Sequence, residues 1–283
     1  MNRLWSWQTF SLTLVLLVIA AATVPGCAPA FSQADPEAFD SFATRGAVGE
    51  APRRLHYVEA GQSGGRMIVF VHGTPGSWHA FEAFLREPAL AQRYHMVAVD
   101  RLGFGASAAS GPVTSFAEHA AAISEVFALN QSGAPALVAG HSLGGSIAYR
   151  LAGDYPDAVG ALLVISSALD PALSRPRWYN HFARVPGVGL LLGEQLRIAN
   201  REMMPLADEL SAMLEQVKGL TIPVTVVQGA QDQLVEEGNA DFAETLLTRA
   251  DLNVLRFPEL GHFVIWQRHE RMVAEIEQLM QKL

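Results

Sequence analysis

The chain has 283 residues, of which 50% are hydrophobic and 17% charged, and its formal net charge at pH 7 is -8. That length allows one large α/β domain or two small ones with a substantial core. No run of lysine or arginine offsets the acidic balance. We therefore expect no nucleic-acid partner, because phosphate binding needs a clustered basic surface. The single cysteine excludes an internal disulfide and a cysteine-cluster metal site.

The first 30 residues have the pattern of an export signal. Arg3 is the only charged side chain before an apolar run over residues 10–24, which holds no ionisable group. That run is short for a membrane span followed by a fold. We therefore predict a signal peptide over residues 1–27 and an exported protein, either a cell-envelope lipoprotein or a periplasmic or secreted one. Membrane contact is expected only through this segment or an attached lipid.

Three interpretations of the cleavage site stay open. Residues 24–27, Val-Pro-Gly-Cys, resemble the lipobox of bacterial lipoproteins, in which Cys27 is lipidated and becomes the first residue. Residues 28–30, Ala-Pro-Ala, offer a small-x-small site to ordinary signal peptidase. An uncleaved anchor is the third interpretation. Residues 28–54 are predicted to be a tether that leads into the fold.

Strand-like stretches alternate with helix-like stretches along most of the remaining chain. We expect strands over residues 55–60, 67–71, 94–99, 135–139, 161–166, 223–229 and 253–257, and helices over 78–92, 115–130, 146–153, 239–248 and 267–282. This alternation predicts an α/β fold with a doubly wound, mostly parallel sheet, in which chemistry gathers at the carboxyl ends of the strands. It stops over residues 171–218, which we interpret as a small helical cap inserted into a core of residues 55–170 and 219–283.

A candidate nucleophile lies between a strand-like and a helix-like stretch. Residues 140–144, Gly-His-Ser-Leu-Gly, fit the pattern G-x-S-x-G. Ser142 would then occupy the tight turn between strand and helix, with its Oγ raised at the carboxyl edge of the sheet. Gly140 and Gly144 suit such a turn, because a Cβ at either position would collide with neighbouring backbone. The alternative is a helix-opening turn in which Ser142 is only a cap.

A serine hydroxyl needs a base to take its proton, and the base needs a carboxylate to hold its tautomer. In this kind of sheet the required chain order is serine, acid, histidine. Ser142, Asp232 and His262 satisfy that order, and Asp232 and His262 each come just beyond a predicted strand. Asp170, just past an earlier strand, is the rival acid.

Other polar residues of these motifs are expected to have lesser roles. His141 lies beside the nucleophile and points away from it on a tight turn, and His269 falls within the closing helix. We expect His72 and Asp100 to fix their own loops.

A tetrahedral intermediate needs hydrogen-bond donors aimed at its developing oxyanion. One donor should be the backbone N–H of Leu143, at the start of the helix after the nucleophile. The other is expected to be the N–H of Thr74, just after the strand that ends at Val71.

Five ordered motifs together resemble the α/β-hydrolase fold family, over roughly residues 55–283. They are His-Gly-Thr-Pro-Gly (72–76), Asp-Arg-Leu-Gly-Phe-Gly (100–105), Gly-His-Ser-Leu-Gly-Gly (140–145), Gly-Ala-Gln-Asp (229–232) and Gly-His-Phe (261–263). The resemblance implies a Ser142/Asp232/His262 triad and an oxyanion hole from Thr74 and Leu143. Epoxide hydrolases and haloalkane dehalogenases share the first motif, but they carry Asp where this chain has Ser142. That substitution argues against both chemistries.

The motifs predict a serine hydrolase that cleaves a carboxylic ester through an acyl-enzyme. We expect no cofactor and no metal, since no phosphate loop or dinucleotide fingerprint is present and the histidines are scattered. The apolar cap favours a small apolar ester, with Trp178, Tyr179 and Phe182 as candidate lining residues, although packing on the core would also make a cap apolar. C–C, lactone or amide hydrolysis, perhydrolysis and a non-catalytic binding protein on a hydrolase fold remain alternatives. The sequence leaves the oligomeric state open.

Overall fold

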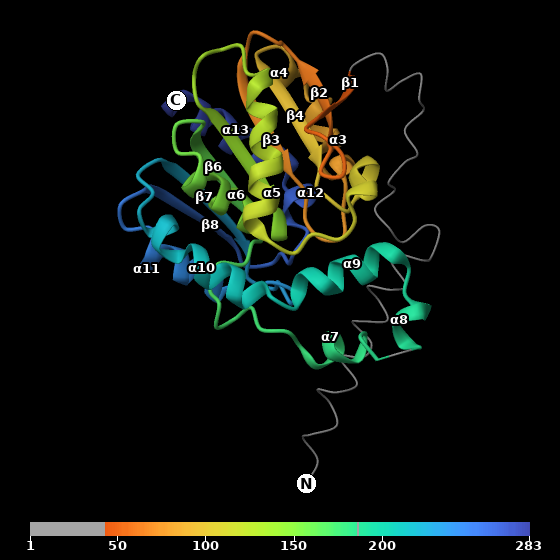
Figure 1. Ribbon diagram of the computed structural model, residues 1–283. Coiled ribbons are helices and arrows are strands. Elements are labelled where there is room, and N and C mark those ends of the chain that lie inside the picture. Colours follow the sequence, from red (N-terminus) through yellow and green to blue (C-terminus); the bar gives the residue numbers. More distant parts are fainter. Residues whose placement is uncertain (1–42, 186) are drawn as a thin grey trace. The chain divides into compact units, whose positions relative to one another are not determined.

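The computed structural model describes residues 43–185 and 187–283 (Figure 1). The predicted signal peptide, its Cys27 and the first part of the predicted tether lie outside the described residues. Among the described residues, no helix combines the length and the apolarity that crossing a bilayer requires.

Eight strands form one sheet in the order β1-β2-β4-β3-β5-β6-β7-β8. They are β1 (Ala43–Val48), β2 (Leu55–Gly61), β3 (Arg66–Val71), β4 (Tyr94–Asp100), β5 (Ala136–His141), β6 (Val159–Ile165), β7 (Pro223–Gly229) and β8 (Asp251–Phe257). The pairs β1–β2 and β2–β4 are antiparallel, and all pairs from β4 to β8 are parallel. The predicted doubly wound, mostly parallel sheet is thus confirmed.

Helices cover both faces of the sheet. Figure 1 shows α5 and α6 in front of the central strands and α13 behind them. In the described residues outside 171–218, the helical elements are η1 (Trp78–Phe81), α3 (Glu82–Leu85), α4 (Pro88–Ala91), η2 (Gly105–Ser110), α5 (Phe116–Ser124), η3 (Glu125–Leu129), α6 (Leu143–Asp154), α11 (Gly238–Leu246), α12 (Val264–Gln267) and α13 (His269–Lys282). Because both faces are covered, the central strands are apolar throughout, and residues 67–71 of β3 are completely buried.

Three predicted segments differ from the structure in the elements that they form. The helix expected over 115–130 is an α-helix only as far as Ser124 and continues as the 3-10 helix η3. Residues 43–48 fall in the predicted tether, but they form the edge strand β1, paired with β2. This strand is half exposed and carries an arginine and a glycine, so it lacks the apolar run that marked the inner strands. The helix expected over 78–92 is divided into η1, α3 and α4, because Pro88 has no N–H to donate and starts a new helix.

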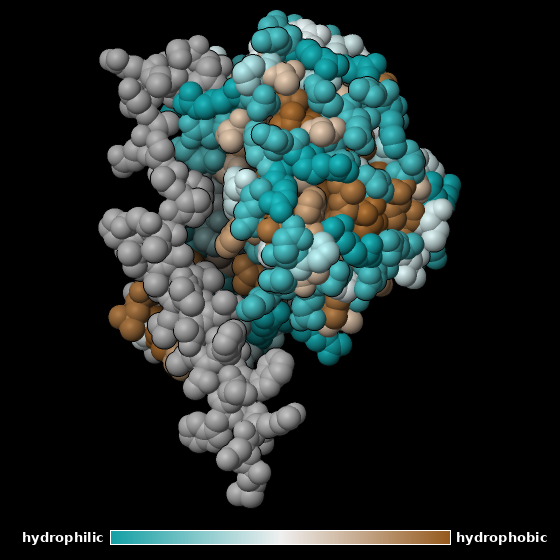
Figure 2. All heavy atoms as spheres, turned by 180° about the vertical axis from the view of Figure 1, so that it is seen from behind, coloured by the Kyte–Doolittle hydropathy of each residue, from teal (hydrophilic) through white to brown (hydrophobic). Residues whose placement is uncertain are grey.

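The described residues of the segment 171–218 form α7 (Trp178–Phe182), α8 (Val188–Leu191), α9 (Glu194–Met203) and α10 (Leu206–Lys218). We keep the name cap for this segment. Trp178 and Phe182 are 52% and 55% exposed, and Figure 2 shows exposed hydrophobic side chains at the place of α8. The buried apolar face of the cap belongs to α9 and α10, with Ile198 and Leu210 among its members.

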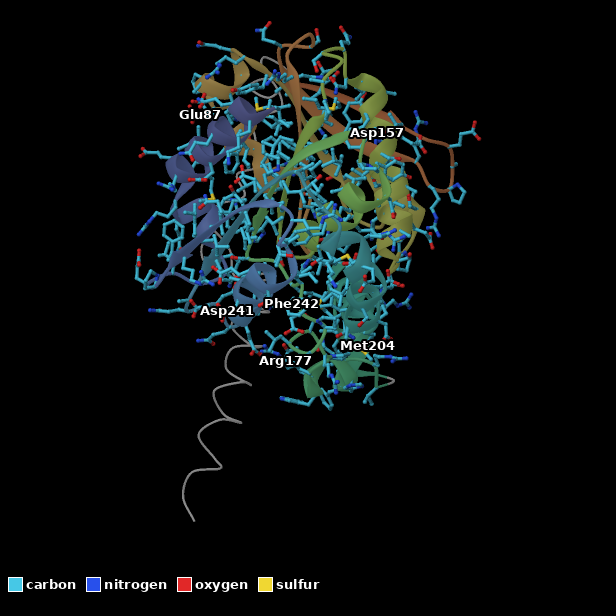
Figure 3. The ribbon with its side chains drawn as sticks, turned by 90° about the vertical axis from the view of Figure 1, so that its left-hand side faces the viewer. Glu87, Asp157, Arg177, Met204, Asp241 and Phe242 are labelled. Atoms are coloured by element: carbon cyan, nitrogen blue, oxygen red, sulfur yellow. The ribbon has the colours of Figure 1, made fainter. Side chains whose placement is uncertain are left out.

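The start of the cap is attached to the loop that follows β7. Arg177 donates hydrogen bonds to Gln233 O at 3.1 Å and to Glu236 Oε1 at 3.4 Å. Figure 3 shows Arg177 on the same side of the molecule as Asp241 and Phe242 of α11. The cap therefore contacts the loop that contains Asp232.

Candidate active site

Ser142 lies between β5 and α6 with φ 54° and ψ -129°. Few residues other than glycine adopt such a positive φ, and the strain must be held by the surrounding structure. The neighbouring glycines permit it: a Cβ at Gly140 would lie 2.5 Å from Gly144 O, and a Cβ at Gly144 would lie 2.1 Å from Val71 O. The G-x-S-x-G pattern thus forms the predicted tight turn at the carboxyl edge of the sheet.

Asp232 and His262 form a buried pair at this same edge. His262 Nδ1 is 2.8 Å from Asp232 Oδ2, and the two residues are 9% and 7% exposed. The backbone N–H groups of Leu234 and Val235 donate to Asp232 Oδ1 at 2.8 and 2.9 Å, which keeps the carboxylate oriented. With a proton on Nδ1 shared with Asp232, the lone pair of His262 Nε2 is available as a base.

The loop after β3 and the residue before Ser142 bring these groups together. A Cβ at Gly73 would lie only 2.8 Å from Ser142 Cβ, so the loop after β3 runs directly past the serine. His141 Nε2 lies 3.1 Å from His262 O. Burial and the nearby His262 lower the pKa of His141 to about 3, so His141 stays neutral and donates this hydrogen bond. Among the described residues, the His262 ring forms no hydrogen bond to Ser142 Oγ.

The other candidates from the sequence are placed elsewhere. Asp170 accepts a hydrogen bond from the N–H of Ala172 in its own loop, at 2.8 Å. Asp100 accepts the N–H of Ala106 in its own loop, so its predicted role in fixing that loop is confirmed, and it also accepts the N–H of Trp78. His269 Nε2 lies 3.2 Å from the carboxylate of Glu87. None of the three contacts the Asp232–His262 pair through a hydrogen bond.

Of the two expected oxyanion donors, one begins a helix and the other follows a strand. Leu143 is the first residue of α6, where backbone N–H groups lack partners within the helix. Thr74 lies in the loop after β3, and its hydroxyl donates a short hydrogen bond to Glu202. His72 holds this loop as predicted, with Nδ1 2.7 Å from Gly73 O and Nε2 accepting the N–H of Arg101 at 2.9 Å.

Sequence reasoning missed a buried ionic cluster next to this loop. Arg101 is fully buried, and its Nη1 lies 2.6 Å from Glu202 Oε1 on α9. His119 Nε2 lies 3.3 Å from the same oxygen. One signal could have revealed it, because Glu202 stands four residues after Ile198 on the apolar face of an amphipathic helix, where a charged side chain needs a partner.

The cluster contains one cation and one anion. Burial alone would raise the pKa of Glu202, but the charge of Arg101 and the hydrogen bonds from His119 and Arg101 outweigh it and lower that pKa to about 2. Burial lowers the pKa of both His72 and His119, so both imidazoles stay neutral. Within the described part of the chain, no three His, Cys, Asp or Glu side chains are grouped so as to hold a metal ion.

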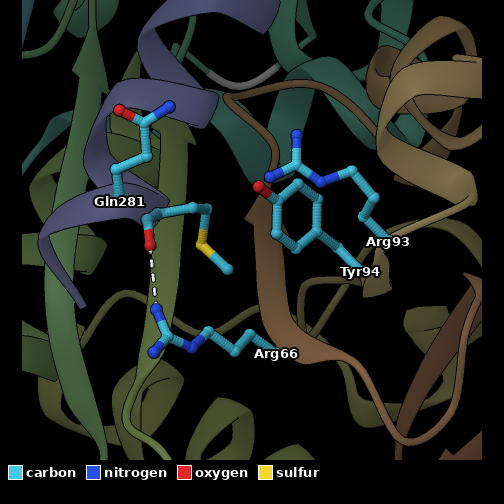
Figure 4. A pocket seen from close by; sticks show the side chains of 5 residues that line it. Arg66, Arg93, Tyr94 and Gln281 are labelled. Carbon is cyan, nitrogen blue, oxygen red and sulfur yellow. Dashed lines mark hydrogen bonds between the residues drawn. The ribbon is translucent and has the colours of Figure 1, made fainter.

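A separate pocket of about 490 Å³ opens at the opposite edge of the sheet (Figure 4). It lies at the amino ends of β3 and β4, beside the end of α13, and is lined by Arg66, Arg93, Tyr94, Met280 and Gln281. Arg66 donates a hydrogen bond to Met280 O at 2.9 Å. Because Ser142, Asp232 and His262 follow the carboxyl ends of strands, this pocket is not part of their site.

This chain is similar in sequence to curated proteins and in structure to solved ones. Epoxide hydrolase 4 of Mus musculus is 32% identical over 114 residues, which are 40% of this chain and 31% of that protein. Lipase LipV of Mycobacterium tuberculosis is 36% identical over 125 residues, which are 42% of each chain. The matches therefore span less than half of either relative. The crystal structure of Cfl2 from Burkholderia cenocepacia has a TM-score of 0.67 at 20% identity, covering 84% of this chain and 95% of that one, which shows a shared fold.

The alpha/beta hydrolase family model matches residues 68–275, from β3 into α13. The matched region contains the turn at Ser142, the Asp232–His262 pair and the cap, and the resemblance found in the sequence motifs is confirmed. The chain belongs to the alpha/beta hydrolase family.

Proposed function

We propose that this protein is a serine hydrolase that cleaves a carboxylic ester. The observation that carries the proposal is the 2.8 Å hydrogen bond between His262 Nδ1 and Asp232 Oδ2, at the edge of the sheet where Ser142 stands on its strained turn. An oriented histidine beside a serine at a strand-to-helix turn is the arrangement that activates a hydroxyl for acyl transfer.

In the first half of the reaction, Ser142 Oγ attacks the ester carbonyl while His262 Nε2 takes the hydroxyl proton. Asp232 stabilises the imidazolium that forms. The N–H groups of Leu143 and Thr74 donate to the oxyanion of the tetrahedral intermediate. The C–O bond to the alcohol then breaks, and His262 returns its proton to the departing oxygen. Ser142 is left as an ester of the acyl group.

In the second half, water replaces the alcohol. His262 removes a proton from the water as it attacks the acyl carbonyl, and the same two N–H groups receive the oxyanion. When the intermediate collapses, Ser142 Oγ leaves with the proton from His262 and the carboxylic acid is released. No external redox reagent enters the balance.

The nucleophile favours an ester over an epoxide. The nucleophile position holds Ser142, and a serine forms an acyl-enzyme, whereas the resemblance assigns an aspartate to the epoxide hydrolases. The relatives include both epoxide hydrolases and a lipase, so the serine carries this choice. The apolar buried face of α9 and α10 is consistent with a small, apolar ester substrate.

The test is covalent labelling of the serine. A fluorophosphonate probe should add one phosphonyl group to the wild-type protein, with loss of fluoride, as measured by intact-protein mass spectrometry. Ser142→Ala and His262→Ala should carry no adduct. Ser146→Ala is the matched control and should leave labelling intact. Ser146 lies in α6, and its hydroxyl donates to Ala168 O, after β6, at 2.7 Å. A folded wild-type protein without an adduct contradicts the proposal.

Export is a further part of the proposal, and it rests on residues 1–30 of the sequence. If Cys27 is lipidated, full-length protein made in bacteria should incorporate labelled palmitate, and Cys27→Ala should not. Cleavage after Ala30 without a lipid would instead leave Phe31 as the first residue, which N-terminal sequencing of the exported protein would reveal.

A further inference from the structure

We propose that Arg101 and Glu202 are a positioning pair that holds the oxyanion loop, defined as residues 72–76, in the geometry needed for acyl transfer. Through Glu202 on α9, the cap and the oxyanion loop then act as one unit. The inference rests on the proposed function, because it assigns a role in forming the acyl-enzyme. It concerns residues that do not touch the reacting atoms.

Arg101 holds two successive carbonyl groups of the loop. Its Nε donates to His72 O and its Nη2 donates to Gly73 O, both at 2.9 Å. Gly73 O and the N–H of Thr74 belong to the same planar peptide group, in which they point in opposite directions. Fixing that oxygen against the guanidinium therefore fixes the direction of the N–H that we expect to donate to the oxyanion.

The guanidinium also polarises this peptide group. A positive charge hydrogen-bonded to the carbonyl oxygen draws electron density away from the amide nitrogen, which makes the opposite N–H a better donor. Arg101 is fully buried, so water screens the effect little. The same residue thus aims the Thr74 N–H and strengthens it.

Glu202 completes the arrangement from the cap. Its two carboxylate oxygens lie 2.6 and 3.3 Å from Arg101 Nη1 and Nη2, which holds the guanidinium in one orientation. Glu202 Oε2 also accepts a hydrogen bond from the Thr74 hydroxyl. A single carboxylate of α9 therefore restrains both the side chain of Thr74 and the arginine that restrains its peptide group.

The sign of the charge effect separates positioning from simple electrostatics. A negative carboxylate near the oxyanion loop would, by charge alone, oppose the negative charge that develops on the substrate. If charge alone decided the rate, the neutral variant Glu202→Gln would form the acyl-enzyme faster. If Glu202 positions the loop, the same variant should be slower, because the guanidinium and the Thr74 hydroxyl lose a shared acceptor.

Glu209 provides a matched control. It lies on α10, and its Oε2 accepts the backbone N–H of Phe116 at 2.7 Å. Glu209 thus also joins the cap to the core through a carboxylate, but Phe116 starts α5 and is not part of the oxyanion loop. A variant that merely weakens the attachment of the cap should behave like Glu209→Gln.

The experiment measures the rate of fluorophosphonate labelling against probe concentration in the full-length protein, with thermal unfolding of each variant alongside. Labelling joins Ser142 Oγ to phosphorus rather than to a carbonyl carbon, but the phosphoryl oxygen also gains negative charge and needs the same two N–H donors. Its saturation separates probe binding from bond formation. We expect Glu202→Gln to lower the maximal rate about tenfold to a hundredfold, somewhat less than removal of an oxyanion donor, with the half-saturating concentration little changed. Glu209→Gln should keep the wild-type maximal rate even where its Tm falls.

Thr74→Val keeps the inference testable if Glu202→Gln does not fold. It removes only the hydroxyl that donates to Glu202, and it should label more slowly than Thr74→Ser, which keeps a hydroxyl. Wild-type maximal rates in folded Glu202→Gln, or equal rates in the two Thr74 variants, overturn this inference and leave the proposed function standing. A wild-type protein that takes no label overturns both.

Discussion

Two of the buried carboxylates at the carboxyl edge of the sheet lie in contrasting settings. Asp232, after β7, is paired with an imidazole and two backbone N–H groups. Glu202, on α9, is paired with a guanidinium that is always charged. A histidine can gain and lose a proton near neutral pH, whereas an arginine cannot. The first pair is suited to moving a proton, and the second to holding a loop still.

The two pairs also differ in what removal of one partner should do. An imidazole carries no permanent charge, so the loss of Asp232 leaves no obligatory buried charge. Arg101 and Glu202 are both fully charged and almost completely buried, so the loss of either leaves an uncompensated ion. We therefore expect substitutions at the first pair to affect activity most, and substitutions at the second to affect stability first.

The largest expected effect on activity is that of Asp232→Asn. The amide should favour the wrong tautomer of His262 and withdraw the charge that stabilises the imidazolium, lowering kcat about 10,000-fold. Steady-state hydrolysis of a soluble short-chain ester measures it. The rival acid supplies the control: Asp170→Asn should retain activity within about tenfold. If instead Asp170→Asn were the more damaging change, the assignment of the acid would be wrong.

Arg101→Met should have the largest effect on stability. It leaves Glu202 as a buried carboxylate without its cation, and we expect the free energy of unfolding to fall by about 3–5 kcal/mol. Urea unfolding followed by circular dichroism measures this difference. Arg150→Met, which breaks the partly exposed i,i+4 pair with Asp154, should cost less than about 1 kcal/mol. Equal losses of unfolding free energy in the two variants would mean that the buried cluster stabilises the protein no more than an ordinary helical ion pair.

The pKa of Glu202 predicts how stability depends on pH. Its pKa is lowered to about 2 in the folded state, below the ordinary value of 4.5. The native state therefore binds this proton less readily than the unfolded state, so the contribution to stability is fully present above about pH 4.5 and is lost as pH falls toward 2. Integrated over that window, the contribution is about 3 kcal/mol. Between about pH 2 and 4.5, Glu202→Gln should reduce the slope of the free energy of unfolding against pH, as measured by urea unfolding at several pH values. An unchanged slope would contradict this prediction.

The sequence predicted those features that depend on local patterns. Apolar runs over 67–71 and 94–99 correspond to β3 and β4, and Gly140-His-Ser-Leu-Gly predicted the turn at Ser142. Asp232 and His262 could be paired because parallel strands end at one edge of the sheet. These inferences succeeded since each needs only neighbours along the chain or a general rule of strand direction.

The features that the sequence did not predict depend on tertiary contacts. Strand β1 is stabilised by its pairing with β2, and its own half-exposed pattern gives little signal. Arg101 and Glu202 are 101 positions apart, and their contact exists only once α9 packs beside the end of β4. No local pattern encodes that packing. The charge of Glu202 on an apolar helix face indicated a partner, but not which one.

His141 connects the turn at Ser142 to the loop that contains His262. Among the substitutions considered, controls apart, its replacement should have the smallest effect on kcat and on stability. It precedes Ser142, and its ring donates to His262 O at 3.1 Å. His141→Phe keeps a ring of similar size but leaves that buried carbonyl without its donor, which should cost about 1–3 kcal/mol of stability. Because His262 would then be less firmly held, kcat should fall about tenfold, with stability measured by urea unfolding and kcat by ester hydrolysis. His269→Phe is the control and should leave kcat unchanged, because the His269 ring meets the carboxylate of Glu87 at 3.2 Å and not the Asp232–His262 pair. A drop in kcat as large as that of Asp232→Asn would mean that His141 takes part in proton transfer. His141 would then belong with the Asp232–His262 pair, which moves a proton, and not with the residues that only hold the site in place.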